Sequence, residues 1–305
     1  MRAKNLELLI TLSNQNSDIQ LDKPISAFDD FVKFTKFRLS FLVVLSAIFC
    51  YLLATSNPDN YVILLLAIGG FLVTASSNGF NQILERETDK LMNRTKNRPL
   101  PSGRMKLDSA YIISFATGIF GLILLAFINL PCVILGFFAL LSYVWMYTPL
   151  KQKSPFAVFI GAFPGAVPSM LGWVAATGKI DAGALICFGI QFIWQFPHFW
   201  AIAWVLDDDY KKAGFKMLPS GNRDKSSAFQ AFVYASSLIP ICLVPYFFHI
   251  TGATSAIICV IISIAFAYQS FVLFKTCDMK AARSLMFGSF LYLPLVQIIF
   301  VLDKI

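Results

Sequence analysis

Charge is scarce in this chain of 305 residues, and the residue types that build soluble metal centres are scarcer still. Charged residues make up 14% of the sequence against 57% for the hydrophobic types, and there are only two histidines. This composition excludes an ordinary water-soluble domain. The six cysteines form no CxxC pair and no Cys/His cluster, so the sequence indicates neither a disulfide framework nor a zinc site.

The N-terminal segment also lacks the marks of a cleaved targeting peptide. It has no apolar stretch of signal-peptide length, and it mixes acids with bases, unlike an Arg-rich transit peptide. No fixed-period repeat or linker divides the rest of the chain. We therefore expect a bacterial inner-membrane protein with a cytoplasmic N-terminal lead, residues 1–38, and one membrane domain, residues 39–305.

What the chain has in abundance is apolar runs long enough to cross about 30 Å of hydrocarbon. Nine runs of this kind predict an all-α membrane protein, a bundle of nine transmembrane helices. The predicted spans are Leu39–Thr55, Tyr61–Leu84, Ala110–Asn129, Pro131–Tyr147, Pro155–Thr177, Ala182–Leu206, Phe229–Ile250, Thr254–Phe274 and Leu285–Leu302.

The basic residues predict how this bundle is oriented. Every Lys and Arg except Lys179 and Lys304 falls in the lead or in a loop that follows an even-numbered span. By the positive-inside rule these segments are cytoplasmic, and the C-terminus lies on the opposite face. The net charge of +8 then reflects cytoplasmic loops, and we expect no nucleic-acid partner.

A first polar constellation stands at the end of the second span. Asn81, Glu85 and Asp89 recur every four residues, so on a continuing helix they form a stripe about 12 Å long. Oxygen ligands on one face suit a hard cation such as Mg²⁺. The basic residues that follow, Arg94, Lys96 and Arg98, suit phosphate oxygens. The combination favours a diphosphate held through Mg²⁺, and the competing interpretation is a solvated helix end.

A second constellation follows the sixth span. The acids Asp207, Asp208 and Asp209 precede Lys211 and Lys212 on the same membrane face, which predicts a second Mg²⁺ site opposite the first. The competing interpretation is a solvated charge run.

His198 lies about 13 Å deeper than the second acidic group and should face a cavity or a partner. The sequence is compatible with three roles for this residue: a haem ligand, a proton acceptor or a structural histidine.

Together these motifs resemble the protohaem IX farnesyltransferases, or haem O synthases, which belong to the UbiA-type intramembrane aromatic prenyltransferases. The resemblance spans about residues 37–302. It is carried by the Asn81–Asp89 stripe, Met92–Leu100, Tyr147–Lys151, Gly161–Trp173, Trp194–Trp200 and Asp209–Pro219. Two positions depart from the family pattern: Glu85 stands where Asp is common, and Ser169 stands where a second Pro is usual.

The resemblance implies that two acid-rich motifs face each other over a central cavity, capped by cytoplasmic loops, and hold Mg²⁺ and farnesyl diphosphate. The implied metal ligands are Asn81, Glu85, Asp89 and Asp209, and the implied diphosphate contacts are Arg94, Arg98, Lys151 and Lys212. The run of adjacent acids adds Asp208 as a further predicted metal ligand.

The expected reaction is transfer of the farnesyl group to the 2-vinyl group of haem B, within membrane lipid. His198 and Asp209 are the candidate catalytic residues, and a haem A synthase or a terminal oxidase is the candidate assembly partner.

Two other functions compete with this one. A quinone precursor or another aromatic acceptor would need the same diphosphate chemistry. A haem or lipid transporter should show membrane-embedded charges along a pathway, whereas the acids here concentrate at one face. A phosphatidyl-alcohol transferase is disfavoured because its Asp-Gly and Ala-Arg signature is absent.

Overall fold

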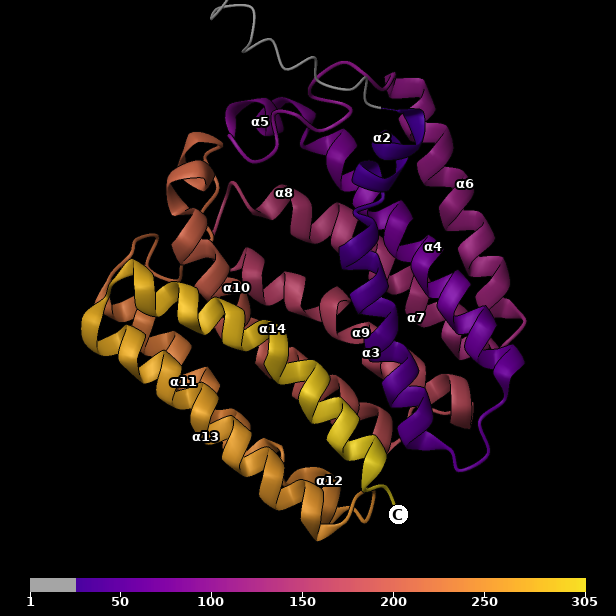
Figure 1. The fold of residues 1–305 in the computed structure, drawn as a ribbon. Helices are drawn as coiled ribbons and strands as arrows, with labels where there is room; N and C mark the ends of the chain where they lie inside the picture. Colours follow the sequence, from indigo (N-terminus) through magenta and orange to yellow (C-terminus); the bar gives the residue numbers. More distant parts are fainter. Residues whose placement is uncertain (1–25) are drawn as a thin grey trace, which may run out of the picture.

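The computed structural model describes residues 26–305, so most of the predicted lead lies outside the described residues. Within that range nine helical segments are long and apolar enough to span a membrane, which confirms the predicted all-α bundle (Figure 1). They are α3 (Phe37–Ala54), α4 (Asn60–Leu84), α6 (Leu107–Ala126), the segment Leu130–Leu150, α9 (Ala157–Thr177), α10 (Ala182–Lys212), the segment Lys225–Phe247, α13 (Ala253–Thr276) and α14 (Met279–Leu302).

Two of these segments are composite, and two short helices flank the bundle. Leu130–Leu150 consists of α7 (Leu130–Leu141), a π-helical turn (Ser142–Tyr147) and α8 (Thr148–Leu150). Lys225–Phe247 consists of α11 (Lys225–Ile241) and α12 (Val244–Phe247). The short helices α2 (Ala27–Phe34) and α5 (Arg86–Leu91) lie at one end of the bundle, and the C-terminus lies at the other end (Figure 1).

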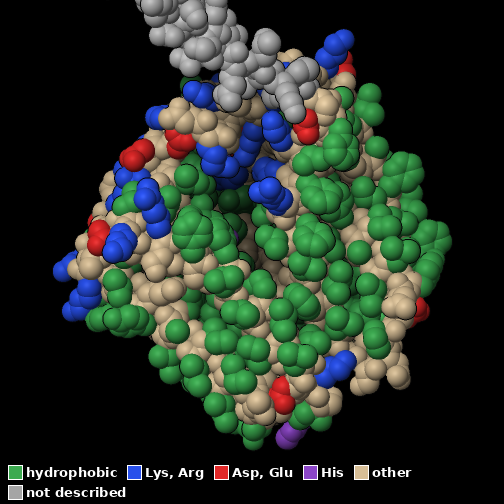
Figure 2. Space-filling model, viewed as in Figure 1, with side chains coloured by type: hydrophobic (Ala, Val, Ile, Leu, Met, Phe, Trp, Pro, Cys, Tyr) green, Lys and Arg blue, Asp and Glu red, His purple; other side chains and the backbone are tan. Residues whose placement is uncertain are grey.

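Side-chain N-caps begin most of the long helices. Asp or Asn side chains accept hydrogen bonds from the first free backbone N–H groups of five of them, which satisfies donors that the helix leaves unpaired. The outward faces carry large apolar side chains such as Ile112, Phe120 and Leu291 (Figure 2). Such a surface is stable only in lipid, which agrees with a multi-pass membrane protein.

Small residues and buried amides hold the helices together. A Cβ atom at Gly172 of α9 would overlap the Ala47 carbonyl of α3, so these two backbones meet at van der Waals contact. Deeper in the bundle, the hydroxyl of Ser46 donates to Gln191 at 2.6 Å and accepts from Gln297 at 2.6 Å. This chain of hydrogen bonds joins α3, α10 and α14.

Helix α10 is longer than predicted, and this changes where the second acidic group sits. It continues six residues beyond Leu206 to Lys212, so Asp207–Asp209 lie on a helix and not in a loop. The fourth span, predicted to end at Tyr147, continues as helix up to Leu150. Asn81, Glu85 and Asp89 keep their helical spacing across the break between α4 and α5. The N–H of Glu85 donates to the Asn81 carbonyl at 2.9 Å, and the N–H of Asp89 donates to the Glu85 carbonyl at 2.7 Å.

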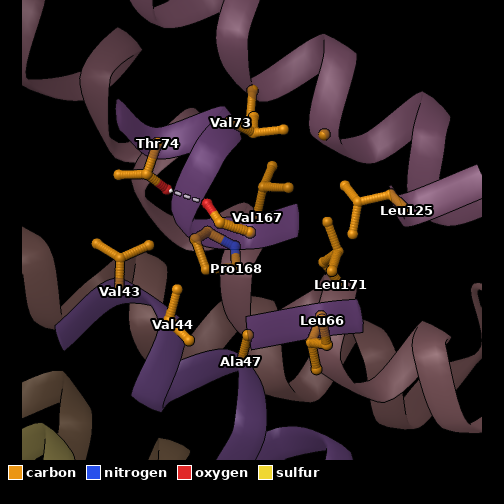
Figure 3. A pocket seen from close by; sticks show the side chains of 13 residues that line it. Val43, Val44, Ala47, Leu66, Val73, Thr74, Leu125, Val167, Pro168 and Leu171 are labelled. Atoms are coloured by element: carbon orange, nitrogen blue, oxygen red, sulfur yellow. Dashed lines mark hydrogen bonds between the residues drawn. The ribbon is translucent and has the colours of Figure 1, made fainter. Parts of the chain in front are cut away.

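An apolar cavity of about 40 Å³ lies between α3, α4, α6, α7 and α9 (Figure 3). Val44, Val73, Leu125 and Leu171 are among its lining, and its one polar side chain, Thr74, bonds the Gly70 carbonyl at 2.8 Å. Since a water occupies about 30 Å³ of liquid, this space is far too small for an isoprenoid chain. It is a gap in helix packing. A separate hollow opens at the surface below a group of Lys and Arg side chains (Figure 2).

Candidate active site

Each oxygen-bearing residue of the first stripe receives a basic side chain from a different segment. Lys36 Nζ lies 3.1 Å from Asn81 Oδ1, Lys151 Nζ 2.8 Å from Glu85 Oε1, and Arg98 Nη1 2.7 Å from Asp89 Oδ2. Asn81, Glu85 and Asp89 are 1%, 7% and 0% exposed. Buried charges need partners of this kind, because an unpaired carboxylate would be very costly away from water.

The fold places these three cations by three local devices. Lys36 has a left-handed backbone (φ 47°) in the two-residue junction of α2 and α3, which turns it back toward α4. Lys151 follows the π-helical turn and lies 4.6 Å from the centre of the Tyr147 ring. Such turns recur at functional sites because they re-aim the side chains that follow. The Arg98 loop is anchored by Thr95, whose hydroxyl donates to the Asp89 carbonyl at 2.8 Å.

The surroundings shift the pKa values of the two lysines in opposite directions. Burial, together with the nearby Arg98 and Lys151 charges, holds the pKa of Lys36 well below its ordinary value. Burial acts to lower the pKa of Lys151, but the Glu85 carboxylate, together with the Tyr147 and Tyr143 side chains, raises that pKa above its ordinary value. Lys36 thus contacts the neutral Asn81 side chain, whereas the neighbouring carboxylates of Glu85 and Asp89 pair with Lys151 and Arg98, and the charged form of Lys36 is disfavoured. Lys and Arg side chains gather at the mouth of the hollow (Figure 2).

Asp209 links the second acidic helix end to the first. Its carboxylate accepts hydrogen bonds from the backbone N–H groups of Asn93 at 3.2 Å and Arg94 at 3.0 Å, and it pairs with Lys212 at 3.1 Å. The end of α10 is thus bonded to the loop that carries Arg98. The side chains of Arg94 and Lys96 are exposed above this contact.

The three consecutive aspartates of α10 differ in their surroundings. Asp207 is buried and pairs with Lys211 at 2.8 Å. The Asp208 side chain is 79% exposed and is gripped by the Arg223 guanidinium, with three N···O distances of 3.1 Å. For Asp208 to bind a metal as predicted, this contact with Arg223 would have to open.

The donor set fits a hard cation that shares its coordination with a ligand. Among residues 26–305, no three carboxylate, imidazole or thiol groups lie together as a ready metal centre. Mg²⁺, however, takes only one or two protein carboxylates and completes its shell with water and substrate phosphate. Asp89 Oδ1 is buried without any hydrogen-bond partner, and an orphaned carboxylate oxygen of this kind is a natural Mg²⁺ ligand.

His198 stands apart from the acids, on the α14 side of α10. Its Nδ1 lies 2.8 Å from Ser289 Oγ of α14, and its ring stacks on Trp194 with centroids 4.5 Å apart. Phe290 closes the edge of the ring at 5.4 Å. The imidazole is half-buried among aromatic groups, at a depth where polar side chains need a partner.

Comparison with known proteins shows the family of this chain. The UbiA prenyltransferase family matches residues 43–293. The chain belongs to this family. It is 50% identical to a protoheme IX farnesyltransferase of Cytophaga hutchinsonii, over 92% of this chain and 99% of the relative, and 47% identical to one of Christiangramia forsetii, over 92% and 94%.

Solved UbiA-type structures share the fold. A digeranylgeranylglyceryl phosphate synthase superposes with a TM-score of 0.76 at 23% identity, covering 90% of this chain and 98% of the other. A UbiA homologue from Archaeoglobus fulgidus, bound to GPP and Mg²⁺, superposes with a TM-score of 0.69 at 14% identity, covering 89% and 99%.

Sequence reasoning overlooked two members of the polar group in this UbiA prenyltransferase. Lys36 was counted only as an orienting charge, and Thr148, whose hydroxyl accepts from Asn81 Nδ2 at 3.3 Å, was not considered. The sequence signal for Lys36 is its position directly before the first apolar span, where a basic side chain can reach the membrane boundary. Thr148 carries no signal of its own, because only the π-helical turn directs it inward.

Proposed function

We propose that this UbiA prenyltransferase transfers the farnesyl group of farnesyl diphosphate to the 2-vinyl group of haem B and so forms haem O. The observation that carries the proposal is the agreement between two features. One is the 50% identity with a protoheme IX farnesyltransferase over nearly the whole chain. The other is a group of buried oxygen-bearing side chains and basic side chains that suits a metal-bound diphosphate, on a protein whose surface opens into a hollow below Lys and Arg side chains (Figure 2).

Mg²⁺ is the proposed metal, held by Asp89 and Glu85 with Asn81 as a further oxygen ligand and Asp209 facing them from α10. When bound, it supplies Lewis-acid stabilisation of the negative charge on the departing diphosphate. The structure with GPP and Mg²⁺ belongs to a distant homologue and supports a divalent metal in the family at large. Asp208 stays a predicted ligand, with its contact to Arg223 as the obstacle.

The basic residues are proposed to bind the diphosphate oxygens. Arg98 and Lys151 are held in place by their carboxylate partners, and Lys36 adds a third donor from the α2–α3 junction. Arg94 and Lys212 lie at the exposed rim, where they are placed to meet the incoming phosphates. Such positioned donors act most strongly on charge that develops during bond breaking.

The proposed reaction exchanges a carbon–oxygen bond of the farnesyl donor for a new carbon–carbon bond to haem. The bond between C1 of the farnesyl chain and oxygen breaks, and its electron pair leaves with diphosphate. The vinyl group bonds to C1 through its terminal carbon, and water adds to the resulting cation with loss of one proton. An apolar enclosure protects the farnesyl cation from early capture by water. Burying the chain at about 0.8 kcal/mol per methylene favours a site within the membrane. His198 is the candidate to position haem or the water.

We further propose that the acid-bearing end of the bundle is cytoplasmic and that the protein resides in a bacterial inner membrane. The distribution of Lys and Arg supports this orientation, which puts the C-terminus on the opposite face. The division into a lead, residues 1–38, and a membrane domain, residues 39–305, stays a prediction, as does a haem A synthase or terminal oxidase as partner.

Product analysis with matched variants tests the function. Purified protein is supplied with Mg²⁺, farnesyl diphosphate and either haem B or a quinone precursor, and products are identified by mass. We expect haem O only. Asp89→Asn should lower the rate at least 100-fold, whereas Glu87→Gln, an exposed acid on the same short helix, should stay within twofold of wild type. A prenylated quinone precursor, or haem that is moved across vesicles without any change in mass, would overturn the proposal.

A further inference from the structure

The hydrogen bonds around Ser289 determine which nitrogen of His198 carries the proton. Ser289 Oγ lies 2.6 Å from the Met286 carbonyl and 2.8 Å from His198 Nδ1. A hydroxyl has one hydrogen to donate, and a carbonyl can only accept. The serine proton therefore goes to Met286, and the second contact requires His198 Nδ1 to donate to Ser289 Oγ. In a neutral imidazole this leaves a free lone pair on Nε2.

Several contacts hold this arrangement rigid. Ser289 is fully buried, and its own carbonyl accepts a hydrogen bond from Trp194 Nε1 at 3.1 Å. Trp194 in turn stacks on the imidazole, at an interplanar angle of 21°. The indole, the serine and the histidine thus form one unit that joins α10 to α14. Rotation of the His198 ring would break the hydrogen bond to Ser289 and the stacking together.

The position of His198 on α10 suits a large planar ligand. His198 lies seven residues, or two turns, from Gln191, so both lie on one face of the helix. Gln191 contacts Ser46 of α3, and this face is therefore turned toward the interior of the bundle. Along the helix His198 is about 16 Å from Asp209. That separation is on the scale of a macrocycle placed beside a prenyl diphosphate bound at the acidic end of the bundle.

We propose that Ser289 is a positioning residue that holds His198 as its Nδ1–H tautomer, so that Nε2 can bind the iron of the haem substrate as an axial ligand. The inference rests on the proposed function, since it takes haem as the acceptor. Histidines that ligate metals commonly donate their other N–H to a fixed acceptor, which sets the ring orientation and strengthens the bond to the metal. Here Ser289 Oγ is that acceptor.

Spectroscopic titration of the purified full-length protein with ferric haem B tests the assignment. Wild type should give the optical and electron paramagnetic resonance signals of an axial histidine. His198→Gly should lose them, and added imidazole should restore them. Ser289→Ala should weaken haem binding 10- to 100-fold, the usual effect of losing such a partner, while Ser289→Thr should retain most of the affinity.

Two controls separate the iron bond from a structural role. Ser263→Ala removes another buried hydroxyl next to α14, 2.7 Å from the Tyr292 hydroxyl, and should leave haem binding unchanged. Iron-free protoporphyrin IX should bind wild type and His198→Gly alike. Unchanged axial signals in His198→Gly, or equal haem affinity in Ser289→Ala and wild type, would overturn this inference while haem O formation by wild type still upheld the proposed function. If wild type neither bound haem nor converted it, the proposed function itself would fail.

Discussion

Lys36 brings a positive charge to the candidate active site from outside both acidic helix ends. Its ammonium group contacts Asn81 at 3.1 Å, and neighbouring cations help to hold its pKa below the ordinary value. A charge kept in such a place contributes little to folding, because its charged form is disfavoured there. The charged form of Lys36 would be stabilised only when an anion binds beside it. Lys36 is thus expected to serve the diphosphate more than the fold.

Substitution of Lys36 by Met should therefore weaken diphosphate binding without loss of stability. A hydrogen bond to a charged group contributes about 1.5–3 kcal/mol, so we expect KM for farnesyl diphosphate to rise roughly 10- to 100-fold. The melting temperature should not fall, since the lost cation was already disfavoured. Lys33→Met, an exposed lysine on α2, is the matched control and should leave both quantities unchanged. A Lys36→Met protein with normal KM and a lower melting temperature would assign this lysine to folding.

Asp208 and Asp209 are adjacent in sequence but should respond differently to the same substitution. Asp209→Asn weakens charge-assisted bonds from two backbone N–H groups and from Lys212, and should raise KM for farnesyl diphosphate at least 10-fold. Asp208→Asn loses an exposed contact with Arg223, and such pairs contribute about 0–1 kcal/mol. If the contact with Arg223 stays closed in the working enzyme, so that Asp208 does not reach the metal, the steady-state kinetics of Asp208→Asn should remain within a few fold of wild type. Equal losses in the two variants would instead support both acids as metal ligands.

At the scale of helices, apolar run length predicted all nine spans, because in lipid a segment of that length can satisfy its backbone only as a helix. Helix ends were harder to predict. Three aspartates in a row read as a loop, yet α10 continues through them, because Asp207 is buried against Lys211 and Arg223. The acid stripe of α4 and α5 was predictable from its spacing. Arg98 and Lys151 were predicted as site residues, but the contact of Lys36 with Asn81 was not, since these two residues are 45 positions apart.

Close packing of α3 on α9 depends on one glycine. A Cβ atom at Gly172 would strike the Ala47 carbonyl, which is backbone and cannot move cheaply, whereas a Cβ atom at Gly189 of α10 would meet no other side chain or helix. We expect Gly172→Ala to destabilise the protein by about 1–3 kcal/mol through overpacking. Gly189→Ala should raise stability slightly, by up to about 1 kcal/mol, from helix propensity. Thermal unfolding in detergent, followed by size-exclusion chromatography, compares the two. Equal melting temperatures would contradict this packing.

For the molecule as a whole, polarity along the membrane normal is strongly uneven. The acidic helix ends and the basic residues that pair with them lie at the end of the bundle that also carries α2 and α5, and the opposite end holds Lys179 and Lys304 (Figures 1 and 2). The positions of Lys and Arg relative to the predicted spans indicated this asymmetry, because loop charges are read directly from the sequence. The convergence of the loops on one hollow was not predictable in the same way, since it depends on helix crossings set by small residues such as Gly172.

Thiol labelling in membranes tests the orientation that this asymmetry predicts. Cys277 lies between α13 and α14 and is half-buried, whereas the other five cysteines are buried and should stay silent. A membrane-impermeant maleimide should label Cys277 in inverted vesicles but not in intact cells. Ser56→Cys, in the exposed loop between α3 and α4 at the other end, should give the reverse pattern once Cys277 is replaced by Ser. Detergent-solubilised protein should label in both cases, which shows that each thiol can react.

The expected pattern follows from the cost of moving charge across lipid. Each Lys or Arg at the bilayer centre costs about 2.5–3.5 kcal/mol on insertion scales, so the more basic loops stay on the side where they are made. That side is the cytosol, so the proposed orientation would place Lys36, Arg98 and Lys151 where a cytosolic diphosphate can reach them. Labelling of Cys277 in intact cells would show that this end of the bundle faces outward, and the three basic residues would then lie on the opposite side of the membrane from a cytosolic diphosphate. The proposed reaction would then lack a route for its donor, even though the fold remained the same.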